Sequence, residues 1–190
     1  MRAAFTATIA ALAIAALAGC SLEPEPESET APQQQEQTDM SAEPPAIAAD
    51  QQALLQSGDP KLAANKKLVY DMYRIVLQAG LADRAGEFIA EDYVQHNPNA
   101  GQGLAGVQDY IRKTRPEREI KDTLELPLIH LMAEGDYVTT AFVRPEKDAN
   151  GQTYYSTWFD LYRIENGKIA EHWDPMLKTD VPVDPNEKKI

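Results

Sequence analysis

Hydrophobic residues between positions 61 and 80 recur at helical spacing. In KLAANKKLVYDMYRIVLQAG the apolar positions are Leu62, Leu68, Val69, Met72, Ile75, Val76 and Ala79. This period predicts an amphipathic helix, and Gly80 is a typical stop. Residues 81–93 (LADRAGEFIAEDY) predict a second helix, and residues 104–115 (LAGVQDYIRKTR) predict a third that ends before Pro116.

After residue 120 the hydrophobic period shortens towards strict alternation. This pattern predicts strands within DTLELPLIHLMA (122–133), DYVTTAFVRPE (136–146), TYYSTWFDLYRIE (153–165) and KIAEHWDPML (168–177). Turns are expected at Glu134-Gly135, within 147–152 and at Asn166-Gly167. The Asn-Gly pair is a strong signal for a β-hairpin. Because helices come first and paired strands follow, the sequence predicts an α+β fold with an antiparallel sheet.

The last hairpin carries the candidate chemistry. A two-residue loop at Asn166-Gly167 places Leu161 opposite His172 and Phe159 opposite Asp174. Side chains alternate between the faces of a strand, so one apolar face is expected to carry Tyr155, Thr157, Phe159, Leu161, Ala170, His172 and Asp174. Two titratable groups on such a face indicate an acid/base pair in a pocket. A structural hydrogen bond at the rim of a pocket remains the alternative.

The opposite face of that hairpin is expected to carry Trp158 and Trp173 and to meet the rest of the sheet or a second subunit. Pro175 has no amide hydrogen, so the strand pairing should weaken beside Asp174. The sequence thus places Asp174 at a strand end.

The first 20 residues resemble an export signal. Arg2 precedes an uncharged apolar run over residues 3–19, which is short for a membrane-spanning helix. LAGC at 17–20 resembles the lipobox of bacterial lipoproteins, with Cys20 as the lipidated residue, and Ser21 after it implies sorting to the periplasmic side of the outer membrane. The alternative is cleavage after ALA at 16–18, which would release the protein.

The charge of the chain is unevenly distributed. Residues 21–60 contain nine acidic and no basic residues, are rich in proline, glutamate and glutamine, and are expected to form a disordered tether. From residue 61 onward, 21 acidic residues face 17 basic ones, a mild excess. No basic patch indicates nucleic-acid binding, and the single cysteine excludes an internal disulfide.

Three segments carry a family resemblance. YVQHNPNAGQG (93–103), GDYV (135–138) and FDLYRIENGKIAEHWD (159–174) resemble the SnoaL-like polyketide cyclases of the nuclear transport factor 2-like superfamily. The resemblance covers residues 64–178. It implies a cone-shaped barrel in which a curved antiparallel sheet wraps around about three N-terminal helices, a deep pocket for a small apolar molecule, and a homodimer formed through the sheet.

The resemblance also implies roles for single residues. Asp174 aligns with the general acid/base of the cyclases, and His172 and His96 are expected to line the same pocket. Tyr155, Thr157, Phe159 and Leu161 are expected to contact the ligand. Many relatives carry a histidine at the position of Ala141, so this chain departs from the pattern there.

These expectations leave two functions open. One is an enzyme that abstracts protons without a cofactor, as a cyclase, isomerase or lyase does; the other is a binding or interaction lipoprotein that uses the same cone. No metal is expected, because the spacing of His172 and Asp174 lacks the support of a strong metal motif. The expected organisation is a signal peptide (1–19), a lipidated tether (20–60), the SnoaL-like domain (61–180) and a C-terminal tail (181–190).

Overall fold

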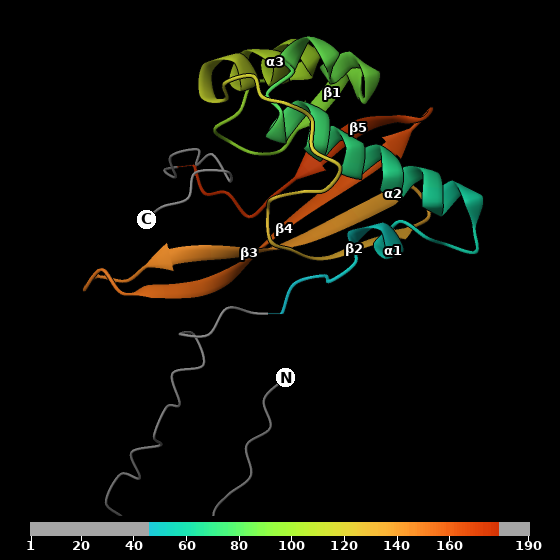
Figure 1. Ribbon diagram of the computed structural model, residues 1–190. Helices are drawn as coiled ribbons and strands as arrows, with labels where there is room; N and C mark the ends of the chain where they lie inside the picture. Colours follow the sequence, from blue (N-terminus) through green and yellow to red (C-terminus); the bar gives the residue numbers. More distant parts are fainter. Residues whose placement is uncertain (1–45, 179–190) are drawn as a thin grey trace, which may run out of the picture. The chain divides into compact units, whose positions relative to one another are not determined.

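A five-stranded curved sheet forms the framework of the folded region (Figure 1). The computed structural model describes residues 46–178. The sheet order is β1-β5-β4-β3-β2, and the strands are β1 (Ile89–Gln95), β2 (Leu128–Glu134), β3 (Tyr137–Lys147), β4 (Thr153–Glu165) and β5 (Lys168–Trp173). β1 pairs with β5 in parallel, whereas the other neighbours are antiparallel. The predicted α+β class is confirmed.

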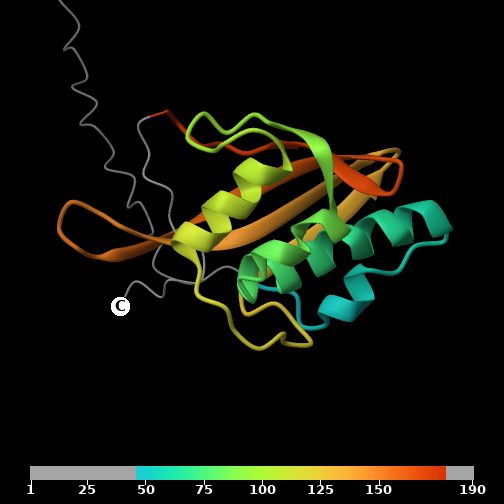
Figure 2. The ribbon, with the colours of Figure 1, turned by 90° about the horizontal axis from the view of Figure 1, so that it is seen from above.

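The helices cover one face of this sheet (Figure 2). They are α1 (Gln51–Leu54), α2 (Pro60–Met72), the π-helical segment η1 (Tyr73–Gln78), the 3₁₀ helix η2 (Ala82–Glu87) and α3 (Gly103–Thr114). α2 and η1 together form the first predicted helix, and α3 is the third. Gly80 ends the first helix at φ +71°, where a Cβ would lie 2.6 Å from the Pro116 carbonyl oxygen. Only glycine fits this position.

The prediction of a second helix over residues 81–93 is wrong in its second half. The 3₁₀ helix η2 ends at Glu87, and β1 begins at Ile89. Ile89 and Tyr93 are both buried, and a spacing of four residues puts two side chains on the same side in a helix and in a strand alike. Parallel pairing with β5 decides in favour of a strand, since Ile89, Val94 and Gln95 pair with residues of β5.

The Asn166-Gly167 turn is confirmed, but the strand pairing beyond it is not. Asn166 (φ +51°) and Gly167 (φ +73°) join Glu165 to Lys168 as a two-residue hairpin loop. A β-bulge follows, because Ile164 pairs with Ile169 while Arg163 pairs with Glu171. This extra residue on β5 shifts the pairing by one position. As a result, His172 lies on the same face of the sheet as the other alternating set of β4 side chains.

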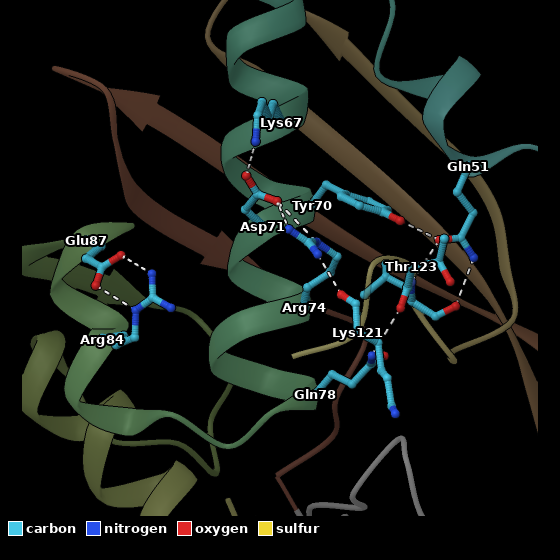
Figure 3. A network of polar contacts seen from close by, with 11 residues as sticks. Gln51, Lys67, Tyr70, Asp71, Arg74, Gln78, Arg84, Glu87, Lys121 and Thr123 are labelled. Atoms are coloured by element: carbon cyan, nitrogen blue, oxygen red, sulfur yellow. Dashed lines mark hydrogen bonds and ion pairs between the residues drawn. The ribbon is translucent and has the colours of Figure 1, made fainter. Parts of the chain in front are cut away.

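A polar network ties the 115–127 loop to the helical layer (Figure 3). Gln78 Nε2 donates to the Thr123 carbonyl oxygen at 3.1 Å, and its Oε1 accepts from the Glu125 amide at 2.8 Å. Arg74 donates to the Lys121 carbonyl oxygen, and Gln51 accepts from the Leu124 amide. We call these bonds the loop-anchoring network.

The core lies between the helices and the sheet. Its most deeply buried side chains are Val69, Tyr70, Val76, Ile111, Leu128, Leu131, Val138, Thr140 and Ile169. Within residues 46–178 no helix has both the length and the apolar character needed to cross a bilayer. The predicted signal peptide, Cys20 and most of the predicted tether lie outside the described residues, as does the predicted tail.

Candidate functional site

A cavity of about 240 Å³ lies between the sheet and the helices, and its lining is mostly apolar. Six aromatic side chains contribute to its wall: Tyr73, Tyr93, Tyr110, Phe142, Trp158 and Tyr162. The cavity is slightly smaller than the range of roughly 300–1,000 Å³ that is typical of sites for drug-sized ligands. It therefore suits a small organic molecule.

Asp160 on β4 is the centre of the polar groups in this cavity. Its Oδ1 accepts from Trp158 Nε1 at 2.9 Å and lies 3.0 Å from His172 Nε2. Its Oδ2 accepts from the hydroxyl of Tyr73, the first residue of η1. Tyr162 in turn donates to Tyr73 Oη at 2.8 Å. A buried carboxylate needs such donors to offset the loss of hydration, and Asp160 has three.

Gln95 on β1 determines the protonation of His172. The Asn97 amide N–H can only donate, and it donates to Gln95 Oε1 at 2.9 Å. Gln95 Oε1 is thereby identified as the oxygen, and it also lies 3.0 Å from His172 Nδ1. His172 Nδ1 must carry a hydrogen. The other ring nitrogen, Nε2, lies 3.0 Å from Asp160 Oδ1, so the imidazole is held between Gln95 and a carboxyl group.

We call these side chains the cavity network: Tyr73, Tyr93, Gln95, Asp160, Tyr162 and His172. β4 carries Asp160 and Tyr162, and η1 begins with Tyr73. The other members lie on β1 and β5, which are neighbours in the sheet (Figure 1), and Gln95 pairs with His172 in their parallel ladder. The His172 ring also stacks on Tyr162, with a centroid distance of 4.7 Å. The position of the imidazole is thus set by a hydrogen bond at each nitrogen and by contact with a ring face.

Asp174 follows β5 and lines the same cavity. The Asn99 amide donates to Asn97 Oδ1 at 2.8 Å, which identifies that atom as oxygen. Asn97 Nδ2 then donates to Asp174 Oδ2 at 2.7 Å, and the Met176 amide donates to Asp174 Oδ1 at 3.0 Å. Both oxygens accept, as in a carboxylate, and each keeps a further lone pair for another donor.

Burial keeps the tyrosines of the cavity in the neutral form. Loss of hydration raises the pKa of Tyr93, and the charges of Asp160 and Asp174 raise it further. The pKa values of Tyr73 and Tyr162 are also raised well above the ordinary value, by burial first and then by the charge of Asp160. These hydroxyls are therefore hydrogen-bond donors throughout the physiological pH range.

Asp160, His172 and Asp174 are the one group of candidate metal ligands found within residues 46–178, with ligand atoms that all lie within 4.8 Å of one another. The three side chains already use these atoms in hydrogen bonds within the protein. This arrangement suits proton transfer better than metal binding.

The structure brings together two of the three predicted catalytic residues. His172 and Asp174 both line the cavity, and their shared face survives the β-bulge because it depends only on their spacing of two. His96 does not line it. Its ring stacks on Trp173 at a centroid distance of 4.6 Å, and its Nε2 lies 3.0 Å from Glu171 on the outer face of the sheet. The prediction that His96 shares the cavity is wrong.

The four residues predicted to contact the ligand also lie outside the cavity. Tyr155, Thr157, Phe159 and Leu161 do not line the cavity, and the Phe159 side chain is 51% exposed. The β-bulge turns the alternate residues of β4 inward instead, so Trp158 lies at the cavity and no longer shares a face with Trp173.

Sequence reasoning missed Asp160 for the same reason. It lies on β4 in the row of Trp158, Tyr162 and Ile164, which an uninterrupted hairpin would assign to the outer face. The available signal is the consecutive apolar pair Ile169-Ala170, since both are buried although neighbours on a regular strand face opposite sides. Such a pair indicates a bulge.

Solved structures with a similar fold include TsrD from Streptomyces laurentii, at 22% identity, covering 62% of this chain and 90% of that one with a TM-score of 0.44. Another is a putative polyketide cyclase from Acidithiobacillus ferrooxidans, at 17% identity, covering 63% and 89% with a TM-score of 0.44. A third is a putative SnoaL-like polyketide cyclase from Jannaschia sp., at 16% identity, covering 63% and 91% with a TM-score of 0.44.

No curated protein matches the chain. The family model described as SnoaL-like polyketide cyclase matches residues 67–176. These residues include the helical layer from the middle of α2 onward, all five strands and Asp174. The chain belongs to the SnoaL-like polyketide cyclase family.

Proposed function

We propose that this domain binds a small carbonyl compound in its cavity and catalyses a proton abstraction without a cofactor. The observation that carries this proposal is the different surroundings of two acidic side chains at one cavity. Asp160 is buried, accepts hydrogen bonds from Tyr73 and Trp158, and lies 3.0 Å from His172 Nε2. Asp174 is less buried and keeps unused lone pairs. Pairs of titratable groups in different environments are typical of acid/base sites.

The two groups have different roles in the proposed reaction. The Asp174 carboxylate removes a proton from the carbon next to a carbonyl group, and the C–H electron pair moves to the carbonyl oxygen as an enolate forms. The enolate carbon then attacks a second carbonyl of the same molecule. In a substrate whose enolate is conjugated with a further double bond, the far carbon of that double bond takes the proton instead, and the double bond shifts. Asp174 returns the proton, so the reaction is a closure or an isomerisation with no net change of atoms. The His172–Asp160 pair lies beside the developing charge.

Deuterium exchange tests this function before the natural substrate is known. An aryl 1,3-diketone is incubated with the domain in D₂O, and its deuterium content is followed by mass spectrometry. We expect exchange above the buffer rate and a loss of roughly 10²–10⁴-fold in Asp174→Asn, which is typical for removal of a general base. Mass spectrometry of ligands that co-purify with the wild type and with Asp174→Asn would identify the natural compound class.

One observation favours a second function, in which the cavity binds a ligand without turnover. His172 uses both ring nitrogens in bonds within the protein, as expected for a structural polar pair. A carrier of this kind would show no deuterium exchange, and Asp174→Asn would leave its ligand affinity largely intact. The same two measurements therefore separate the two functions.

We further propose that the domain is tethered to the cell envelope through Cys20. The support is the LAGC sequence directly after an apolar run, followed by a long acidic segment. Labelling of the full chain with radioactive palmitate should depend on Cys20, and Cys20→Ala should release the protein from outer-membrane fractions. Equal labelling of the variant would contradict lipidation at this residue.

Dimerisation through the outer face of the sheet belongs to the same proposal. Three large apolar side chains are exposed there, Met132 (49%) on β2, Tyr137 (44%) on β3 and Phe159 (51%) on β4. Exposed large apolar side chains that gather on one face are typical of interaction surfaces. Sedimentation should show two copies for the wild type and one for Phe159→Asp.

A further inference from the structure

We infer that the Tyr93 hydroxyl donates a hydrogen bond to the carbonyl oxygen of the bound molecule. This inference rests on the proposed function, and it assigns the site that recognises the oxygen. Tyr93 lies on β1, its side chain is 5% exposed, and it lines the cavity.

The direction of the hydrogen bonds around Tyr93 follows from one backbone amide. The Asn97 N–H can only donate and fixes the orientation of the Gln95 amide group. Gln95 Nε2 must then be the nitrogen, and it lies 2.9 Å from Tyr93 Oη. Because an amide nitrogen donates and never accepts, the Tyr93 oxygen is the acceptor of this bond. The hydroxyl hydrogen of Tyr93 is directed elsewhere.

Among residues 46–178 no hydrogen bond donated by that hydroxyl is found, since the bond that the Tyr93 oxygen makes is the one it accepts from Gln95. Tyr73 and Tyr162 each donate within the cavity network, to Asp160 and to Tyr73 respectively. Tyr93 differs from both, since its described bond uses only its lone pair. A buried donor without an acceptor is costly unless a ligand or water accepts its hydrogen.

The surroundings of Tyr93 select the kind of acceptor. Asp160 and Asp174 are close enough for their charges to raise the pKa of the Tyr93 hydroxyl, so a ligand anion at this place would also face two carboxyl groups. A neutral carbonyl oxygen accepts a hydrogen bond without that repulsion. As the enolate forms, Asp174 takes up the proton and loses its charge, and the same hydrogen bond strengthens because its acceptor gains charge.

Gln95 thereby connects the two sides of the site. Its oxygen accepts from His172 Nδ1, and its nitrogen donates to Tyr93 Oη. A single side chain fixes the tautomer of the histidine and directs the tyrosine hydrogen into the cavity. Tyr93 is a binding group in this assignment, and Gln95 is a positioning residue.

The test uses two probes that differ only at the oxygen, 2-acetonaphthone and 2-ethylnaphthalene. Binding is measured by fluorescence with the wild type, Tyr93→Phe and a matched control, Tyr110→Phe, which also lies at the cavity wall. We expect Tyr93→Phe to bind the ketone roughly 3- to 10-fold more weakly and the hydrocarbon equally well, as for the loss of one neutral hydrogen bond. Tyr110→Phe should not change the ratio of the two affinities.

A vibrational measurement separates a direct contact from a structural effect. The carbonyl stretch of bound 2-acetonaphthone should shift to lower frequency in the wild type and return towards its value in apolar solvent in Tyr93→Phe. Equal losses for both probes, an unchanged stretch, or binding of neither probe by the wild type would overturn the assignment. Absence of deuterium exchange would refute the proposed catalysis alone, because these measurements require binding and no turnover.

Discussion

The loop-anchoring network is built from polar side chains of the helices, and the cavity network mostly from polar side chains of the sheet. The two networks differ in how completely their donors and acceptors are paired within the protein. Gln78 uses its nitrogen on one backbone carbonyl and its oxygen on one backbone amide, so both ends of its amide group are satisfied locally (Figure 3). In the cavity network, the Tyr93 hydroxyl keeps its hydrogen, and neighbouring Asp174 keeps lone pairs.

This difference separates a structural role from a chemical one. A network whose donors and acceptors are matched within the protein gains nothing from a ligand, whereas unmatched groups at a cavity gain a partner when a ligand binds. Variants should therefore affect stability alone in the first network, and both stability and ligand binding in the second.

The largest effect on stability is expected for Asp160→Ala. This change leaves Tyr73, Trp158 and His172 without their common acceptor and should lower the free energy of unfolding by about 3–5 kcal/mol, as for one partner of a buried ion pair. Urea unfolding measures it. Asp109→Ala is the control, since Asp109 forms an exposed i,i+4 pair with Lys113 and should cost at most about 0.5 kcal/mol. Similar losses for both variants would contradict the central position of Asp160.

A smaller effect is expected for Gln78→Ala in the loop-anchoring network. Two backbone groups of the 115–127 loop lose their partner, which should cost roughly 1–3 kcal/mol in urea unfolding. Affinity for 2-acetonaphthone should stay unchanged. A ligand affinity that falls together with stability would remove the distinction between the two networks. Gln152→Ala, at an exposed glutamine, is the matched control.

The buried tyrosines should make the free energy of unfolding depend on pH in the alkaline range. In the unfolded chain a tyrosine loses its proton near pH 10, whereas burial holds the pKa of Tyr93 higher in the folded protein. Below pH 10 both states are protonated and stability is unaffected. Above it the folded protein binds more protons, so stability falls as pH rises, by about 1.4 kcal/mol per pH unit for each such tyrosine.

Tyr93→Phe removes one of these protons and should make the decline above pH 10 shallower by that amount. Urea unfolding between pH 9 and pH 11 measures the slope, with Tyr154→Phe at an exposed tyrosine as the control. An identical slope in wild type and Tyr93→Phe would show that Tyr93 is not held protonated by the fold.

The smallest effect is expected for His96→Gln. His96 contacts Trp173 and Glu171 on the outer face, where the hydrogen bond from His96, followed by that from Arg163, lowers the pKa of Glu171. Probe affinity and deuterium exchange should match the wild type. A loss of deuterium exchange comparable to that in Asp174→Asn would show that His96 takes part in the reaction and would contradict its position outside the cavity.

Much of the fold follows from local patterns in the sequence. The first helix, its stop at Gly80, the third helix and the Asn166-Gly167 turn all depend on contacts within a few residues, and all were predictable. β1 was not, because Ile89 and Tyr93 fit both periods and the choice depends on pairing with β5, about 80 residues away in the chain.

In the candidate site, too, features set by nearby residues were predictable, and features set by long-range pairing were not. The grouping of His172 with Asp174 depends only on their spacing and was predicted. The partners of His172 depend on one inserted residue on β5, which brought Asp160 inward and carried Phe159 outward. A local pattern cannot supply the energy balance that favours a bulge, since that balance includes burial of Ile169 and Ala170 against distant elements.

The parallel pairing of β1 with β5 makes the cavity depend on a long-range contact. Gln95 and His172 are separated by 77 positions in the chain, so their pairing closes a long loop at a cost in conformational entropy. Topologies rich in such contacts fold slowly. A nascent chain must therefore be synthesised past Lys168–Trp173 before the wall of the cavity is complete.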